Sequence, residues 1–249
     1  MQEPPMKTNY DPQSYNGIFN WSATYSTKSE IFVPYSETRL LTPDELKRKG
    51  NEKTNFAAGK DKMAFVAMSK CRVSARLELV KRLGKYVPVD VYGRCKFDLK
   101  LESCPKNSAK CQSIRSRYKF YFAVENSMCE DYITEKYWGN LDTGLVPVVF
   151  GGANYSRLAL PGTFINARDF NSLKELADHL HYLNSNDTAY NEFFKWTYTH
   201  KIERRHSMCR VCEALWNPEL KSKRFLNLGQ LWGRKTMCED IELVMARYS

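Results

Sequence analysis

Long hydrophobic runs are missing from this sequence of 249 residues. A helix that crosses a bilayer needs about 20 consecutive apolar residues, whereas the most apolar run, residues 145–150, is only long enough for a strand. We therefore expect no membrane-spanning helix. The start of the chain, Met1-Gln-Glu-Pro-Pro5, also lacks the basic and apolar regions of a secretory signal peptide.

Glycine-rich phosphate loops and paired aspartates are absent as well. The sequence contains no Gly-x-Gly-x-x-Gly, no Walker loop and no Asp-x-Asp. Because glycine loops let the backbone cradle a phosphate, their absence means that side chains must make most contacts to any bound nucleotide. Many nucleotide-sugar enzymes hold a metal ion with Asp-x-Asp, so cationic side chains are the expected substitute here.

The composition excludes a disordered chain and favours an anionic partner. Apolar residues make up 43% of the sequence, with 13 Phe, 15 Tyr and 5 Trp, which is enough apolar surface to form a core. The net charge is +10, from 38 Lys and Arg against 28 Asp and Glu. These basic residues are scattered and form no stripe with interleaved aromatics, so we expect no nucleic-acid partner.

Cysteines and glycosylation signals favour the secretory pathway. The chain has eight cysteines and three Asn-x-Ser/Thr sequons, at Asn20, Asn154 and Asn186. An even number of cysteines fits disulfides or zinc. The one Cys-x-x-Cys, Cys209 to Cys212, has no second close pair or suitably spaced histidines, so zinc is not favoured.

Apolar periodicity divides the chain into three parts. Residues 1–58 are polar and irregular, with strand-like patches at 18–21 and 31–35 and a capped helix from Thr42 to Gly50. Residues 59–200 alternate strands and helices, and residues 201–249 form a C-terminal helical segment with the Cys-x-x-Cys. In the middle part we predict strands at 63–68, 87–92, 118–124, 145–150 and 163–166, helices at 74–83, 134–141, 172–183 and 187–196, and a loop-rich segment at 96–117. This alternation predicts an α/β fold with a parallel, Rossmann-like sheet.

The densest group of polar residues, Glu125 to Lys136, follows the predicted strand 118–124. Ligands of parallel sheets bind beyond the carboxyl ends of the strands. Lys136 can contact a phosphate there, and Arg76, early in a neighbouring helix, can approach the same crevice with a bidentate guanidinium. On spacing alone, a capped surface helix with solvated Glu135 and Lys136 fits equally well.

The same region resembles a known family. The run Tyr118-Lys-Phe-Tyr-Phe-Ala-Val-Glu-Asn-Ser-Met-Cys-Glu-Asp-Tyr-Ile-Thr-Glu-Lys136 is similar to the signature of the α1,3-fucosyltransferases, glycosyltransferase family 10. Further matches lie at 144–151, 154–155, 163–165 and 169–170, and upstream at 19–25, 31–35, 69–76 and 89–93. The resemblance extends from Glu3 to about Cys212.

The resemblance implies a GT-B-type fold, here one Rossmann-like nucleotide-sugar-binding domain at 59–200 with a remnant of the N-terminal acceptor domain at 1–58. It implies inverting transfer of L-fucose from GDP-β-L-fucose to a GlcNAc hydroxyl of a glycoprotein or glycolipid glycan, in α1,3 linkage. No cofactor is required and a divalent metal is not essential. Family members act in the Golgi lumen, held by an N-terminal anchor and stem; neither these nor most of the acceptor domain are found in this sequence.

Site residues carry over by position. Arg76 and Lys136 would hold the pyrophosphate, Glu135 and Tyr132 would contact the ribose and fucose region, and Asn126 would help to shape that pocket. The family's general base is a Glu in a Glu-Ser-Pro or Glu-Pro-Pro type motif. In this sequence that residue is Glu3, in Glu3-Pro-Pro5.

The resemblance also bears on the cysteines. Cys209 and Cys212 match the family's C-terminal Cys-x-x-Cys, a disulfide element, and either pair with each other or have partners in the missing region. Plausible local pairs are Cys71 with Cys95 and Cys104 with Cys111, although connectivity cannot be read from a sequence.

One departure from the family pattern supports a second hypothesis. The family's Tyr-Arg-x-Asp-Ser-Asp is replaced by Tyr25-Ser-Thr-Lys-Ser-Glu30, which affects acceptor handling more than donor binding. The alternative to an active transferase is therefore a truncated, catalytically impaired homologue that binds a glycan or a nucleotide sugar without turnover.

Overall fold

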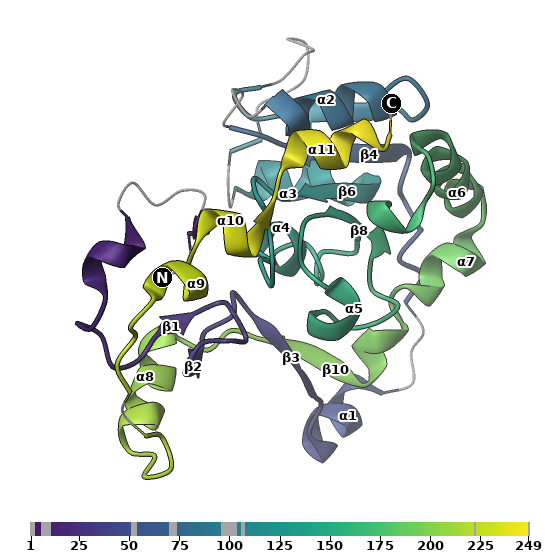
Figure 1. The fold of residues 1–249 in the computed structure, drawn as a ribbon. Helices are drawn as coiled ribbons and strands as arrows, with labels where there is room; N and C mark the ends of the chain where they lie inside the picture. Colours follow the sequence, from purple (N-terminus) through teal and green to yellow (C-terminus); the bar gives the residue numbers. More distant parts are fainter. Residues whose placement is uncertain are drawn as a thin grey trace.

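A five-stranded parallel sheet organises the molecule (Figure 1). The computed structural model describes residues 3–5, 11–50, 54–69, 74–95, 104–105, 108–221 and 223–248. The strand order is β5-β4-β6-β8-β9, and each neighbouring pair is parallel. The strands are β4 (Lys62–Ala67), β5 (Val89–Tyr92), β6 (Tyr118–Val124), β8 (Val146–Phe150) and β9 (Ile165–Asn166). The predicted α/β fold with a parallel sheet is thus confirmed.

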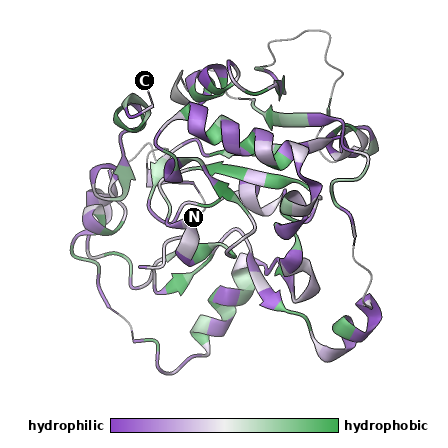
Figure 2. Ribbon diagram, turned by 90° about the vertical axis from the view of Figure 1, so that its right-hand side faces the viewer, coloured by the Kyte–Doolittle hydropathy of each residue, from purple (hydrophilic) through white to green (hydrophobic). Residues whose placement is uncertain are grey.

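Helices cover both faces of this sheet, which explains why its central strands are almost entirely apolar, with Lys119 of β6 as the exception. Every residue of β6 and β8 is buried, as expected for parallel strands with no solvent-facing side. One face packs against α2 (Ser74–Leu83), α6 (Leu173–Ser185), α7 (Asp187–Glu192) and α11 (Ile241–Ala246). The other face packs against α3 (Ala109–Ser116), α4 (Glu135–Trp138) and α5 (Tyr155–Leu158). Figure 2 shows apolar colouring on the central strands and mixed colouring on the helices around them.

Helix α6 illustrates how the sequence sets this packing. Ser172 caps its first turn by accepting a hydrogen bond from the backbone N–H of Glu175 at 3.1 Å. Leu173, Leu176, Leu180 and Leu183 recur at helical spacing and are all buried against the sheet. The amphipathic pattern that predicted this helix is therefore the pattern that attaches it to the core.

In the part of the chain that the structure describes, three two-stranded pairings lie outside the central sheet. In the first, β1 (Ala23–Thr24) runs parallel to β2 (Ile31–Phe32); in the second, β3 (Glu37–Leu40) pairs antiparallel with β10 (His200–Glu203). In the third, β7 (Met128–Cys129) pairs antiparallel with β11 (Cys238–Glu239). The described residues also include α1 (Pro43–Lys49), α8 (Ser207–Leu215), α9 (Leu228–Leu231), α10 (Arg234–Met237) and 3₁₀ turns at Pro12–Tyr15, Ala167–Asp169 and Lys195–Tyr198. The end of the chain thus returns to the sheet, where α11 lies beside α2 (Figure 1).

Several predicted elements need correction. The patch 18–21 is not a strand, and its aromatic Phe19 is exposed. The segment 96–117 was expected to be loop-rich but contains α3, which is capped by Ser108. The predicted helix 134–141 is only the short α4, since Gly139 closes it as C-cap. The helix predicted at 187–196 ends at Glu192 and is followed by a 3₁₀ turn.

The disulfides also differ in part from expectation. The predicted pair Cys104–Cys111 is present. Cys95 is disulfide-bonded, whereas its predicted partner Cys71 lies outside the described residues. Cys209 and Cys212 are not paired with each other. Both are free thiols on the exposed surface of α8. A pair that was not predicted joins Cys129 to Cys238.

Within the described ranges, every helix is too short or too polar to cross a bilayer. The division into 1–58, 59–200 and 201–249 remains a prediction; the central sheet itself lies between Lys62 and Asn166.

Truncating the centre of the sheet should destabilise the fold strongly. Phe120 is fully buried in β6 and contacts the ring of Tyr190. We expect Phe120→Ala to lower the free energy of unfolding by about 3–5 kcal/mol, because it removes a large apolar side chain and leaves a cavity. Leu243→Ala, at a residue of α11 that is 72% exposed, is the control and should change stability by less than about 0.5 kcal/mol. Equal losses in urea unfolding would contradict this account of the core.

Candidate functional site

The loop that follows β6 collects polar side chains at the carboxyl edge of the sheet. The backbone N–H of Glu125 donates to the carbonyl of Phe150 at 2.9 Å, so the β6–β8 pairing continues one residue past the strand. The chain then passes through β7 and reaches Thr134, the N-cap of α4. Residues 125–136, which we call the β6 loop, therefore begin and end at fixed positions.

Two glycines after β8 allow this loop to lie against the sheet edge. A Cβ on Gly152 would be 2.3 Å from the carbonyl carbon of Met128, and one on Gly151 would be 3.3 Å from Cγ of Glu125. A side chain at Gly152 would overlap the backbone, which cannot move aside. Gly152 is thus required by the close approach of the β6 loop, and Gly151 leaves room for the side chains of Tyr155 and Glu125.

Glu125 places a carboxylate at the bottom of the loop. Its side chain is fully buried, and it accepts hydrogen bonds from the backbone N–H of Thr134 at 2.9 Å and from the Thr134 hydroxyl at 2.8 Å. The Lys136 ammonium lies 3.1 Å away. Burial raises the pKa of Glu125, and Lys136 and Thr134 oppose that effect by stabilising the ionised form.

The two cations predicted to bind pyrophosphate, Lys136 and Arg76, come from helices that follow neighbouring strands of the sheet. Lys136 is 15% exposed and contacts the Thr134 hydroxyl at 2.9 Å and the Glu135 carboxylate at 3.4 Å. Arg76 comes from α2, which follows the neighbouring strand β4, and is 5% exposed. Burial lowers the pKa of Arg76, while the negative charges of Glu125 and Glu135 act in the opposite direction. Arg76 and Lys136 therefore come from adjacent crossover units, and Lys136 is in direct contact with both carboxylates.

Tyrosines connect this group to the start of the chain. Tyr132 is buried and hydrogen-bonds to Tyr35, whose ring centroid is 6.1 Å away. Burial raises the pKa of Tyr35 to about 12, and the carboxylates of Glu135, Glu125 and Glu3 also favour its neutral form. Glu3 itself is exposed. The charge of Glu3 thus acts on both Tyr35 and Tyr132, and its role as the base remains a prediction.

Several buried polar atoms at this edge have no partner. Arg76 Nε, Asn126 Oδ1, Ser127 Oγ and Tyr25 Oη are inaccessible to solvent and make no hydrogen bond within the described part of the chain. Buried polar groups are normally paired because an unmade hydrogen bond costs about 1–3 kcal/mol. A group of such atoms around one loop is what a site for a polar ligand would show.

Asp131 fixes the outer part of the loop. It has a positive φ of 59°, and its buried carboxylate accepts hydrogen bonds from the N–H and hydroxyl of Thr27, at 2.9 and 2.7 Å, and from Arg157 at 3.2 Å. These bonds join the loop to the segment that departs from the family pattern, residues 25–30. The substituted residues there have structural partners: Lys28 pairs with Glu130, and Glu30 with Lys223.

A disulfide fixes the loop from the C-terminal side. Cys129, which is fully buried, is bonded to Cys238 where β7 pairs with β11. The backbone N–H of Glu130 also donates to the carbonyl of Met237 at 2.7 Å. The β6 loop is therefore held by the N-terminal segment, the sheet and the C-terminal segment together.

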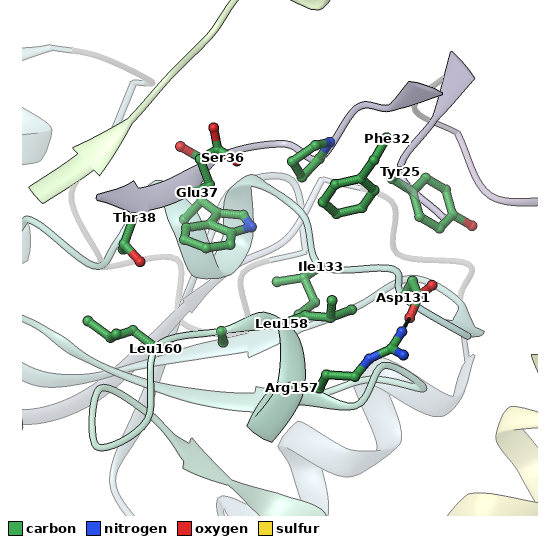
Figure 3. Close-up of a pocket in the computed structure, with 13 residues that line it drawn as sticks. Tyr25, Phe32, Ser36, Glu37, Thr38, Asp131, Ile133, Arg157, Leu158 and Leu160 are labelled. Atoms are coloured by element: carbon green, nitrogen blue, oxygen red, sulfur yellow. Dashed lines mark hydrogen bonds and ion pairs between the residues drawn. The ribbon is translucent and has the colours of Figure 1, made fainter. Parts of the chain in front are cut away.

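A pocket of about 320 Å³ lies beside the loop (Figure 3). Asp131 and Ile133 line it, together with Phe32, Trp138 and Arg157. Its acidic groups already have partners: Asp131 binds Arg157, as Figure 3 shows, and Glu37 binds Arg210. None of the predicted donor residues lines this pocket, so it adjoins the candidate site rather than forming it.

The predicted site residues stay predictions. Asn126, Tyr132, Glu135 and Lys136 belong to the β6 loop by sequence, Arg76 comes from the neighbouring α2, and the charge of Glu3 acts on Tyr132. The functions of Glu125, Tyr35 and Asp131 in holding the loop were missed, as was Cys129–Cys238. A usable signal did exist for the disulfide, since Cys129 and Cys238 were the two cysteines left without a proposed partner.

The three glycosylation candidates occupy turns or helix caps. Asn154 and Asn186 cap α5 and α7 through their side-chain oxygens. Asn20 and Asn154 are exposed and Asn186 is half-buried. Their modification remains a prediction.

Comparison with known proteins identifies the family. The description "Glycosyltransferase family 10 (fucosyltransferase) C-term" matches residues 57–231, which include the whole sheet and the β6 loop. The chain belongs to glycosyltransferase family 10. The fucosyltransferase resemblance that was stated from the sequence is confirmed.

Individual relatives agree with this assignment. Glycoprotein 3-alpha-L-fucosyltransferase A of Drosophila melanogaster is 35% identical over 228 residues, which cover 88% of this chain and 44% of that protein. Alpha-(1,3)-fucosyltransferase C of the same organism is 30% identical over 249 residues, covering 93% of this chain and 58% of that protein. The chain thus spans about half the length of the curated relatives it matches. A crystal structure of an alpha1,3-fucosyltransferase with GDP-fucose is 19% identical, with a TM-score of 0.49 over 81% of this chain and 50% of that one.

Removal of the Cys129–Cys238 bond should loosen the loop. We expect Cys238→Ser to lower the free energy of unfolding by about 2–5 kcal/mol, because the bond closes a segment of 109 residues. Amide hydrogen exchange in residues 125–134 should accelerate in the same variant. Cys209→Ser, which changes an exposed free thiol, is the matched control. If both variants exchange and unfold alike, the disulfide does not hold the loop.

Proposed function

We propose that this fucosyltransferase-family chain transfers L-fucose, with inversion, from GDP-β-L-fucose to a GlcNAc hydroxyl of a glycoprotein or glycolipid glycan, in α1,3 linkage. What supports the proposal is that Arg76 and Lys136 follow adjacent parallel strands, β4 and β6, and that the Lys136 ammonium lies beside the Glu125 and Glu135 carboxylates. A diphosphate that reaches both cations would gain charge-assisted hydrogen bonds of about 1.5–3 kcal/mol each.

The proposed roles follow from the chemistry of inversion. One base must remove the acceptor proton as the hydroxyl attacks the anomeric carbon, and Glu3, near Tyr132, is assigned that role. Negative charge develops on the departing GDP, and Arg76 and Lys136 stabilise it. Tyr132 and Glu135 contact the ribose and fucose region, and Asn126 offers its unpartnered buried Oδ1 to the donor.

The proposal also covers the need for a metal ion, the role of the sheet in the whole enzyme and the cellular location. The two cations take the place of a metal, so no divalent ion is essential. The sheet would serve as the nucleotide-sugar half of a GT-B arrangement. The disulfides and sequons support a Golgi lumenal location.

A non-enzymatic role is the second candidate. The exposed Glu3 and the structural use of Thr27, Lys28 and Glu30 favour a protein that binds a nucleotide sugar or glycan without turnover. The two candidates share the donor site and differ in whether Glu3 supports transfer.

GDP binding tests the donor site. We expect GDP to raise the melting temperature of the chain, because a ligand of the native state stabilises it. Arg76→Ala and Lys136→Ala should each raise the Kd for GDP about 10–150-fold in isothermal titration calorimetry, which corresponds to the loss of one charge-assisted hydrogen bond.

The control for this titration is Lys174→Ala, which changes an exposed lysine paired with Asp178 on α6 and should leave the Kd unchanged. Addition of EDTA should also leave it unchanged. Equal affinity of the Arg76 and Lys136 variants and the wild type would overturn the donor-site assignment, and loss of binding in EDTA would overturn the proposed independence from metal.

Fucose transfer tests the role of Glu3. We expect Glu3→Gln to lower the transfer rate about 10²–10⁴-fold, the usual contribution of a general base, with little change in the Kd for GDP. The measurement is a GDP-release assay with a GlcNAc-terminated glycan. Glu192→Gln, at an exposed residue near the end of α7, should behave like the wild type. A wild-type chain that binds GDP but releases none above background would favour the non-enzymatic candidate.

A further inference from the structure

Glu125 is a buried carboxylate that the proposed reaction does not use. It lies at the end of β6 with no exposed side-chain surface, and a neutral apolar residue would pack there without the cost of burying a charge. Its contacts within the described residues explain what the charge does: the N–H and hydroxyl of Thr134 and the ammonium of Lys136 all direct hydrogen atoms toward it. This set of donors matches an ionised carboxylate, which can only accept.

Lys136 needs such a partner because lysine has a long, flexible side chain. Its ammonium has three N–H groups, and three oxygen atoms surround it: the Thr134 hydroxyl at 2.9 Å, Glu125 at 3.1 Å and Glu135 at 3.4 Å. The first two acceptors are buried, whereas the Glu135 side chain is 60% exposed. The contact with Glu135 is the longest and the most open to solvent, and it is therefore the one that an incoming anion can replace.

We propose that Glu125 is a positioning residue. Its carboxylate, together with Thr134, holds the Lys136 ammonium so that the third N–H group, which faces Glu135, can bind the donor diphosphate. This inference rests on the proposed function, since it assigns Lys136 to the diphosphate. Glu125 does not touch the nucleotide. When the diphosphate binds, Lys136 exchanges its contact with Glu135 for a phosphate oxygen, and Glu135 becomes available to the sugar.

The close fit around Glu125 supports the proposal. Its carboxylate has the Lys136 ammonium at 3.1 Å as its ion-pair partner. Gly151 keeps the space beside it free, since a Cβ there would lie 3.3 Å from Glu125 Cγ.

A double-mutant cycle on GDP binding tests the proposal. We expect Glu125→Gln to raise the Kd for GDP at least tenfold, because the amide presents an N–H group where Lys136 and Thr134 need an acceptor. In a Lys136→Ala background the same change should alter the Kd less than twofold, since Glu125 acts through Lys136. Glu45→Gln, at a hydrogen-bonded carboxylate on α1 that pairs with Arg39, is the matched control and should leave the Kd unchanged in both backgrounds.

A second measurement needs no nucleotide. In ¹⁵N NMR of lysine ammonium groups, a held ammonium gives a sharp signal that exchanges slowly with water, and Lys136→Met identifies the signal of Lys136. Glu125→Gln should abolish that signal, and Thr134→Val, which removes the bridging hydroxyl, should weaken it. Thr134→Val also serves as the test variant if Glu125→Gln does not fold.

These results separate the inference from the proposed function. A wild type that binds no GDP contradicts the donor site, and the lysine signal then decides alone whether Glu125 positions Lys136. Equal effects of Glu125→Gln with and without Lys136, tighter GDP binding by Glu125→Gln, or an unchanged lysine signal in the variants would each overturn the inference.

Discussion

The interaction between the buried Glu125 carboxylate and its donors on Thr134 and Lys136 is the constraint on which the site depends. A charge that is removed from water must be compensated by hydrogen bonds and opposite charge. At this position the compensation comes from the far end of the same loop, so the loop must fold back on itself over Glu125. The buried charge of Glu125 therefore also determines the conformation of the β6 loop.

The groups that compensate the charge of Glu125 must be held rigidly in place. Three distant parts of the chain hold the β6 loop. The sheet supplies Phe150 and the glycine pair, the N-terminal segment supplies Thr27, and the C-terminal segment supplies Cys238. The site is therefore a product of the tertiary fold and not of the motif alone. Residues that depart from the family pattern also belong to this tertiary framework: Lys28 pairs with Glu130 of the loop, and Glu30 pairs with Lys223.

The sequence predicted those features that depend on local patterns. Strand β6 and helix α2 were predicted at the bounds observed, because their apolar residues follow the periods of a buried strand and an amphipathic helix. The place of the loop at the carboxyl end of a strand also predicts a ligand site there, which remains a prediction. Features that depend on distant pairing were missed: β3 and β10 are separated by about 160 residues, and neither carries an apolar alternation that would indicate a strand.

The same limit applies to the candidate site. Arg76 and Lys136 were predicted to meet because neighbouring parallel strands end at the same edge. Glu125 was not assigned a role, because whether a carboxylate is solvated or buried depends on what covers it, and here that includes Gly151 and Tyr155. The pairing of Cys129 with Cys238 was open to elimination from the sequence, but the antiparallel contact of β7 with β11 that brings the two together depends on the tertiary fold.

The late position of Cys238 in the chain has a consequence for biosynthesis. The family match ends at residue 231, whereas the strand and cysteine that clamp Met128 and Cys129 lie at 238–239. During translation the β6 loop emerges from the ribosome long before its clamp does. The Cys129–Cys238 bond can form only after residue 238 has been synthesised, so the β6 loop acquires its C-terminal clamp late in the synthesis of the chain.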